Sequence, residues 1–217
     1  MNLVLFDFDK TIINKDSGAA FMRFIIFRNP IRLMFCALAA PLAALFLVHE
    51  KTKRVGFSIW LWIATFAMHR KKVVHLRNAF IKAFSSDRTT RVLARAQLAH
   101  HFQQGDRIII VSGASKWIVR KLIAQMALTH TELICSEEKR IAFGMVCTFH
   151  CISSNKVLRL TETVDTANYN SITGYSDSAS DIPMLNICSQ RIVINPTKRC
   201  LKKFTHVFRN DMKIKKW

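Results

Sequence analysis

The chain has 217 residues, which is long enough to bury a sizeable core, and it contains no repeat and no low-complexity linker. Its 33 lysine and arginine residues outnumber its 14 acidic residues, so the formal charge is +19. A positive electrostatic field attracts polyanions, which are either nucleic acids or anionic lipid surfaces. The 6 cysteines lie mostly in apolar contexts, which predicts buried, reduced thiols, and the lack of a C-x-x-C pair argues against a structural zinc site.

The first predicted element is an apolar strand that ends in two acids. Residues 3–13 read LVLFDFDKTII, and a run this apolar is typical of a parallel sheet covered on both faces, in which ligands bind at the strand ends. Side chains two residues apart on an extended backbone face the same way, so Asp7 and Asp9 can share one pocket and a divalent cation. One carboxylate can attack a phosphorus atom while the other handles the proton of the leaving group. The alternative is a strand end with two solvated acids.

Two further segments supply groups that can hold a phosphate. Residues 107–115 read RIIIVSGAS, a second apolar strand that ends in Ser112 and Gly113, where a hydroxyl and backbone N–H groups are available. Lys156, in CISSNKVLRL, lies near the start of a predicted helix and can neutralise both a phosphoryl group and an attacking carboxylate. The alternative for a lone lysine is a solvated surface residue.

A fourth segment adds two more carboxylates. Residues 172–185 read ITGYSDSASDIPML, in which Asp177 follows a short strand and Asp181 lies four residues later. Asp177 can complete a magnesium site, and Asp181 can support that site by contacting the ligands of the metal.

Taken in order, DFDKT, VSGAS, the lysine and YSDSASD resemble the four motifs of the haloacid-dehalogenase-like phosphatase superfamily, in its phosphoserine-phosphatase-like branch. The resemblance implies an α/β fold with a Rossmann-like parallel-sheet core and a helical cap inserted after the first strand. The core would comprise residues 1–13 and 99–217, and the cap residues 14–98. The glycine often seen two residues after the cysteine of the lysine motif is Ser153 here, a departure that bears on loop shape more than on chemistry.

The same resemblance implies a role for each motif residue. Asp7 is expected to be the nucleophile of an aspartyl-phosphate mechanism, and Asp9 its general acid and base. Mg²⁺ is expected on the side chains of Asp7 and Asp177 and on the backbone carbonyl of Asp9. Ser112, Gly113 and Lys156 are expected to hold the phosphate, and Asp181 and Thr11 to contact the ligands of the metal.

The predicted cap contains two uncharged stretches. Residues 33–48 (LMFCALAAPLAALFLV) and 55–68 (VGFSIWLWIATFAM) would form helices of roughly 24 Å and roughly 21 Å, short of the ~30 Å hydrocarbon core of a bilayer. We therefore expect residues 31–68 to insert as an interfacial or re-entrant segment, with Trp60 and Trp62 at the headgroup level. The alternative is that these helices form the core of a soluble cap. Basic residues flank each boundary, namely Arg23, Arg28, Arg32, Lys51, Lys53, Arg54, Arg70, Lys71 and Lys72.

These segments extend the resemblance over nearly the whole chain. DFDKTIINKDSGAAFMRFIIFRNP, LWIATFAMH and GYSDSASDIPML resemble the phosphatidylglycerophosphatase C family of Gram-negative bacteria. That resemblance implies removal of the terminal phosphate of phosphatidylglycerophosphate, with a phospholipid phosphate as substrate and an anionic membrane surface as partner. The expected location is the cytoplasmic face of the bacterial inner membrane. No cleaved signal peptide is expected, because the expected nucleophile precedes the apolar segment.

Two other functions fit parts of the sequence. A soluble phosphoserine-phosphatase-like enzyme acting on small phosphate monoesters would share all four motifs, but its cap would lack uncharged stretches. A nucleic-acid-binding protein would explain the charge, but the chain has no RNA- or DNA-binding motif, so no nucleic acid is expected as a partner. The sequence carries no signal for the oligomeric state.

The remaining segments complete the predicted elements. His75, His100 and His101 have no ligand spacing and are assigned no role. Residues 213–217 form a basic and aromatic tail that is either solvated or a second surface anchor. Residues 73–98 are expected to form one or two helices, 115–129 a helix, 132–137 and 142–149 short strands, 191–196 a core strand and 197–204 a basic helix.

Overall fold

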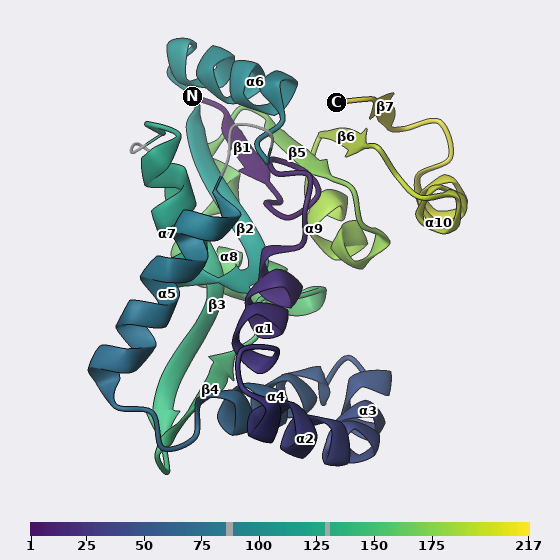
Figure 1. Ribbon diagram of the computed structural model, residues 1–217. Coiled ribbons are helices and arrows are strands. Elements are labelled where there is room, and N and C mark those ends of the chain that lie inside the picture. The colour runs from purple at the N-terminus through teal and green to yellow at the C-terminus, as the bar shows by residue number, and fades with distance from the viewer. Residues whose placement is uncertain (86–88, 129–130) are drawn as a thin grey trace. The chain divides into compact units, whose positions relative to one another are not determined.

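The computed structural model of the chain describes residues 1–85, 89–128 and 131–217 (Figure 1). The chain divides into two compact units, which we call the core unit (residues 1–15, 87–135 and 151–217) and the cap unit (residues 16–86 and 136–150). The predicted boundaries differ from these in three places. The cap unit includes residues 136–150, which the sequence placed in the core, and the core unit includes residues 14–15 and 89–98, which the sequence placed in the cap.

A largely parallel sheet forms the centre of the core unit. Its strand β1 is buried along its whole length, because both faces of the sheet are covered, and it pairs in parallel with β2 on one side and β5 on the other. The strands β6 and β7 continue the parallel pairing beyond β5, so the expected α/β parallel-sheet fold is confirmed. In spatial order the strands are β3 (Glu132–Ile141), β2 (Arg107–Ser115), β1 (Leu3–Phe6), β5 (Ile172–Ser176), β6 (Gln190–Ile194) and β7 (Lys213–Lys215).

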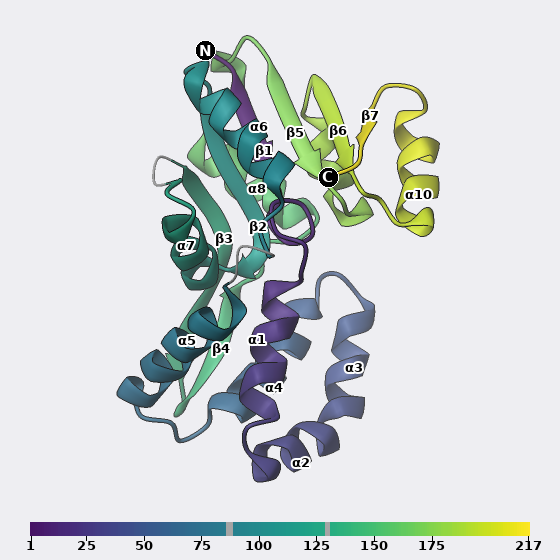
Figure 2. The same ribbon diagram turned by 45° about the horizontal axis from the view of Figure 1, so that its top comes forward.

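Helices connect the strands of the core unit. The expected helix after the second strand is α7, and the expected basic helix is α10, which lies at the outer end of the sheet beyond β6 in both views (Figures 1 and 2). The helices are α6 (Val92–Gln103), α7 (Lys116–Gln125), α8 (Ser154–Thr163), α9 (Ile182–Asn186) and α10 (Lys198–Phe208), with short 3-10 helices η1 (Thr166–Asn168) and η2 (Ala179–Asp181).

A buried polar network ties β1, β5 and α6 together. His101 Nδ1 lies 2.8 Å from Asp106 Oδ2, and His101 Nε2 lies 2.8 Å from the hydroxyl oxygen of Tyr175. The Tyr175 ring stacks on Phe6 with 4.2 Å between centroids, and the Tyr175 carbonyl accepts the N–H of Asp7 at 2.9 Å. The network therefore fixes the end of β1, where the site begins, and His101 has a structural role that its sequence context does not indicate.

The cap unit combines helices with an antiparallel hairpin. The side chains of Asp16 and Asn29 each accept a backbone N–H of the helix that follows, as N-cap residues do. Phe21 and Phe80 pack edge to face, with 5.1 Å between ring centroids, and join the first and last helices of the unit. The helices are α1 (Ser17–Ile26), α2 (Pro30–Leu38), α3 (Ala40–Val48), α4 (Lys53–Thr65) and α5 (Arg70–Phe84), and the hairpin pairs β3 with β4 (Gly144–Phe149).

The helix α4 packs against β4 and α3 within the cap unit. The Trp62 indole N–H donates to the carbonyl oxygens of Ile141 and Ala142, at 3.2 and 3.0 Å, and a Cβ atom added to Gly144 would meet the Trp62 ring at 2.5 Å. Leu61 is buried at 1% exposure. Packing within the unit therefore accounts for much of the uncharged stretch 55–68, as expected if these residues form the core of a cap, although Val55 and Phe66 are 38% and 43% exposed.

The other uncharged stretch remains exposed. Residues 33–48 do not form one helix, because α2 and α3 meet at Ala39 with a bend of 53° and Pro41, which lacks an N–H, lies in the first turn of α3. In the described residues no single helix is long and apolar enough to cross a membrane, and only the bent pair of α2 and α3 together reaches that length and composition. Helix length thus gives no support to the expected membrane-associated helices. We call the exposed residues Met34, Phe35, Leu38, Leu42, Leu45 and Val48, which are 52% to 72% accessible, the α2–α3 apolar surface.

Candidate active site

The junction that follows β1 positions Asp7 and Thr11. Asp7 is buried at 6% exposure directly after the strand. The chain then turns sharply, because the N–H groups of Ile12 and Ile13 both donate to the carbonyl of Phe8, at 2.9 and 3.1 Å. This turn brings the hydroxyl of Thr11 back to the carboxylate of Asp7.

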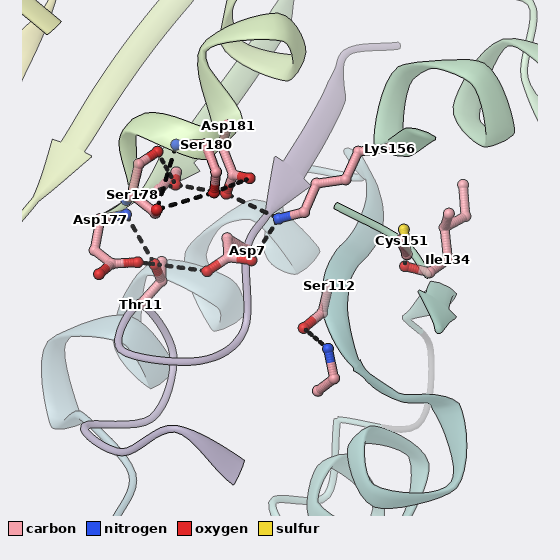
Figure 3. Close-up of polar contacts among 12 residues, drawn as sticks. Asp7, Thr11, Ser112, Ile134, Cys151, Lys156, Asp177, Ser178, Ser180 and Asp181 are labelled. Atoms are coloured by element: carbon pink, nitrogen blue, oxygen red, sulfur yellow. Dashed lines mark hydrogen bonds and ion pairs between the residues drawn. The ribbon is translucent and has the colours of Figure 1, made fainter. Parts of the chain in front are cut away.

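Lys156, in the first turn of α8, reaches Asp7 through a buried ion pair (Figure 3). Its Nζ lies 2.7 Å from Asp7 Oδ1 and 2.8 Å from Asp181 Oδ2, and all three residues are buried. Burial excludes the alternative of a solvated surface lysine. The ammonium group instead neutralises the expected nucleophile.

Thr11 links two of the carboxylates. Its Oγ1 lies 3.3 Å from Asp7 Oδ2 and 3.5 Å from Asp177 Oδ1, and the same oxygen accepts the N–H of Asp177 at 3.1 Å. The two side chains expected on magnesium therefore lie on either side of one hydroxyl group, as Figure 3 shows. Asp9 is half-buried in the turn between Asp7 and Thr11.

Asp181 contacts Lys156 and two serines. Ser176 Oγ donates to Asp181 Oδ2 at 2.7 Å, and Ser180 Oγ donates to Asp181 Oδ1 at 3.4 Å. The sequence predicts Asp181 as a support for the metal ligands, and the structure pairs it with Lys156, the lysine expected to hold the phosphate. Sequence reasoning does not single out Ser176, although the alternation of serine and aspartate in YSDSASD is a signal that would have indicated it.

The strand end at Ser112 and Gly113 lies beside the loop that leads to Lys156. Ser112 is buried, and its Oγ accepts the N–H of Ala114 at 3.1 Å, so the hydroxyl shapes the end of β2. A Cβ atom added to Gly113 would meet Cγ2 of Ile152 at 3.0 Å, which explains why the smallest residue stands there. Figure 3 shows Ser112 on β2, set apart from the carboxylates that gather around Lys156.

The clustered carboxylates perturb one another. Burial raises the pKa of Asp7 to about 8; Lys156 acts in the opposite direction, and the charges of Asp181 and Asp177 add to the rise. Burial and Asp181 raise the pKa of Asp177 to about 6. Burial lowers the pKa of Lys156, but Asp181 and Asp7 more than offset this, so the pKa of the lysine is raised overall. The site therefore holds more carboxylate groups than its lysine can neutralise, which favours a bound cation.

The donor set fits Mg²⁺. The described residues contain no group of three or more His, Cys, Asp or Glu side chains that could hold a metal ion. Magnesium, however, keeps several of its waters and is usually held by one or two carboxylates together with substrate phosphate. Asp7 and Asp177, joined through Thr11, match that pattern.

The loop before α8 carries an unusual backbone conformation. Ser153 has a φ of 49° and a ψ of −128°, a region that residues with a side chain rarely adopt. Glycine, which the resemblance leads one to expect here, adopts this conformation freely. The serine at position 153, where the resemblance predicts glycine, therefore affects the backbone conformation of the loop. Lys156, three residues later, still reaches Asp7.

The parallel sheet places this protein in the α/β class, with a cluster of buried carboxylates at the ends of its central strands. The sequence profile of the haloacid dehalogenase-like hydrolases matches residues 4–186, and the chain belongs to this family.

Known proteins agree with this assignment. The chain is 22% identical over 212 residues to a histidinol-phosphatase of Neisseria meningitidis serogroup C (strain 8013), covering 90% of each chain. Among solved structures it is similar to a protein of unknown function from Bordetella pertussis Tohama I, with a TM-score of 0.78, 17% identity and coverage of 98% and 97%. A phosphoserine phosphatase solved as a phospho-aspartyl intermediate analogue gives a TM-score of 0.62 at 17% identity, with coverage of 98% and 92%. The expected superfamily and its phosphoserine-phosphatase-like fold are therefore confirmed.

Proposed function

We propose that this chain is a magnesium-dependent phosphomonoesterase that forms an aspartyl-phosphate on Asp7 and acts on a small, water-soluble phosphate ester. The observation that carries the proposal is the 2.7 Å ion pair between Lys156 Nζ and the buried carboxylate of Asp7. Family membership supports it, and so do the relatives, which bear the names histidinol-phosphatase and phosphoserine phosphatase.

The chain's own residues can carry both halves of the reaction. In the first half, an oxygen of Asp7 attacks phosphorus, the bond from phosphorus to the leaving oxygen breaks, and Asp9 gives that oxygen a proton. In the second half, Asp9 takes a proton from water, the water oxygen attacks phosphorus, and inorganic phosphate leaves with Asp7 restored. Lys156 offsets the charge of the phosphoryl oxygens throughout, with Ser112 and its neighbouring N–H groups as further donors. Magnesium bound at Asp7 and Asp177 would supply additional positive charge at the same oxygens.

The direct test is phosphate release from a substrate panel, with and without magnesium. The panel contains phosphoserine, histidinol phosphate and a long-chain lipid phosphate in mixed micelles. We expect turnover of a small ester that needs magnesium, together with an acid-stable phosphoenzyme that is absent from Asp7→Asn. Turnover in Asp7→Asn at the wild-type rate would refute the proposed mechanism.

One observation favours a second substrate class, a lipid phosphate such as phosphatidylglycerophosphate. The α2–α3 apolar surface is exposed, and the segment from residue 17 to residue 49 contains basic residues but no acid. An apolar helix face next to basic residues suits the headgroup region of an anionic membrane. Under this candidate the protein docks peripherally on the cytoplasmic face of a bacterial inner membrane.

A pair of matched variants separates the two substrate classes. Leu38→Glu and Leu45→Glu place charges on the α2–α3 apolar surface, at positions that are 69% and 70% exposed, and Val92→Glu makes the same change at an 80% exposed site of the core unit. If lipid phosphate is the substrate, the first two variants lose turnover of the long-chain lipid but keep turnover of the small ester, and Val92→Glu keeps both. No turnover of the lipid by the wild type would eliminate this second candidate.

A further inference from the structure

The helix α10 has two contrasting faces. Phe204 and Phe208 are buried, with 6.2 Å between their ring centroids, and they anchor the helix in the core unit. At about 100° per residue, the opposite face forms one continuous arc that contains no acidic side chain and no phenylalanine, tyrosine or tryptophan. The residues of this arc, all exposed, are Lys198, Arg199, Lys202, Lys203, His206 and Arg209, which we call the α10 basic face.

The charges at the N-terminal end of this face do not stabilise the helix, whereas His206 lies in the last turn, where the helix dipole favours a cation. Lys198 and Arg199 lie in its first turn, where the positive end of the helix dipole favours acidic residues, and no acidic residue is present in that turn. Within the described residues, the side chains of the α10 basic face form no salt bridge. Asp211, the acid that follows the helix, pairs with Arg191 instead. The positive charge is therefore available to a partner outside the chain.

The position of α10 connects this face to the active site. The helix contacts η2, whose Asp181 pairs with Lys156 at 2.8 Å. An anionic partner bound on the α10 basic face would thus contact a helix that itself packs against η2.

We propose that the α10 basic face docks the core unit onto an anionic phospholipid surface. A cluster of four to eight basic residues on an amphipathic helix is the usual signature of such binding, because many headgroup charges can be met without fixed geometry. Single-stranded nucleic acids are instead bound by basic residues interleaved with exposed aromatic rings, and both phenylalanines of α10 are buried. Val207, at the margin of the face, is 45% exposed and adds apolar contact with the headgroup region.

The test is vesicle flotation, which measures binding and does not depend on turnover. Full-length protein is mixed with phosphatidylcholine vesicles that contain or lack phosphatidylglycerol, at low and high salt. Lys202→Gln combined with Lys203→Gln removes two charges from the α10 basic face. The control is Arg120→Gln combined with Lys121→Gln, which removes two exposed charges from α7. Hydrolysis of a small ester is measured for every variant, to show that each protein is folded and active.

We expect wild type to float with the anionic vesicles, less so at high salt, and weakly with neutral ones. The α10 double variant should lose affinity for anionic vesicles by about thirtyfold, and the α7 control by much less. Equal losses in both double variants, or no loss in either, would overturn the proposal. A selective loss of DNA-duplex binding in the α10 variant, with vesicle binding unchanged, would also overturn it and point to nucleic acid as the partner.

Discussion

Lys156 and Asp181 form a buried ion pair, with 2.8 Å between Nζ and Oδ2. The same ammonium group lies 2.7 Å from Asp7, so one lysine is shared by the expected nucleophile and by a carboxylate that the sequence associates with the metal. Asp181 is in turn fixed by Ser176, whose Oγ lies 2.7 Å from Oδ2. Asp181 is therefore a positioning residue for Lys156.

The first prediction follows from that pairing. Asp181→Asn keeps the size of the side chain but removes the charge that holds Lys156, so the rate constant kcat for a small ester should fall by about tenfold to a hundredfold. The control is Ser180→Ala, which removes a 3.4 Å contact to Asp181 and a 2.9 Å contact to Ser178 at an exposed residue but leaves the charge of Asp181 in place. An unchanged kcat in Asp181→Asn, with normal thermal unfolding, would contradict the positioning role.

The second prediction concerns the stability of the site. Lys156→Met leaves Asp7 and Asp181 buried without their cation, so the free energy of unfolding should fall, by about 3–5 kcal/mol where the pH is high enough to ionise both carboxylates. The pKa of Asp7 is already raised to about 8, and removing Lys156, which lowers it, raises it further. A raised carboxylate pKa favours the folded state at low pH and penalises it as the pH rises through that pKa. Urea unfolding at pH 5 and pH 8 should therefore show the larger loss at pH 8, and a loss that is larger at pH 5 would contradict this account.

The third prediction concerns the chemistry. Asp7→Asn removes the attacking oxygen and should lower turnover by at least about a thousandfold, whereas Asp9→Asn should lower it by about 10²- to 10⁴-fold, the range for a lost general acid and base. Single-turnover kinetics should distinguish the two variants, because only Asp9→Asn retains the attacking carboxylate and can still accumulate phosphoenzyme. Accumulation of phosphoenzyme in Asp7→Asn would show that another residue is the nucleophile.

The site could be predicted from the sequence where it depends on local pattern. Asp7 and Asp177 directly follow apolar strands, and parallel strands bring their ends to one edge of a sheet. The partner of Lys156 could not be predicted, because Asp181 is 25 residues away and lies on a different element. Which carboxylate a lysine meets depends on how α8 and η2 pack.

In the cap unit, amino-acid composition does not predict which uncharged stretch is buried. Both uncharged stretches have the same character, yet α4 packs against β4 while the α2–α3 apolar surface is exposed. The decisive contact of Trp62 is with the carbonyl of Ala142, 80 residues further on. A hydrophobic pattern cannot reveal a partner at that distance in the chain, and for the same reason the sequence assigned residues 136–150 to the core.

The fourth prediction concerns magnesium. Asp177→Asn should raise the magnesium concentration for half-maximal activity by about tenfold to a hundredfold, and Asp165→Asn, the same change at an exposed acid, should not. Burial and Asp181 raise the pKa of Asp177 to about 6, so protons compete with the metal below that pH. The half-saturating magnesium concentration of the wild type should therefore fall as the pH rises from 5 to 8, and this dependence should be weaker in Asp177→Asn. Equal magnesium requirements in the wild type and Asp177→Asn would exclude Asp177 as a ligand.

The last prediction concerns the backbone of Ser153. Its φ of 49° and ψ of −128° suit glycine, and a residue with a side chain is held there at a cost of about 1–3 kcal/mol. Ser153→Gly removes this strain, but glycine also makes the unfolded chain more flexible, so the net free energy of unfolding should rise by about 1 kcal/mol. The adjacent exposed residue provides the control: Ser154→Gly, at the first residue of α8, should lower the stability by no more than about 0.5 kcal/mol, because the cost of glycine is largest in a helix interior. Urea unfolding with an unchanged m-value would measure both changes. If the two variants lose stability alike, the loop before Lys156 is not strained at Ser153.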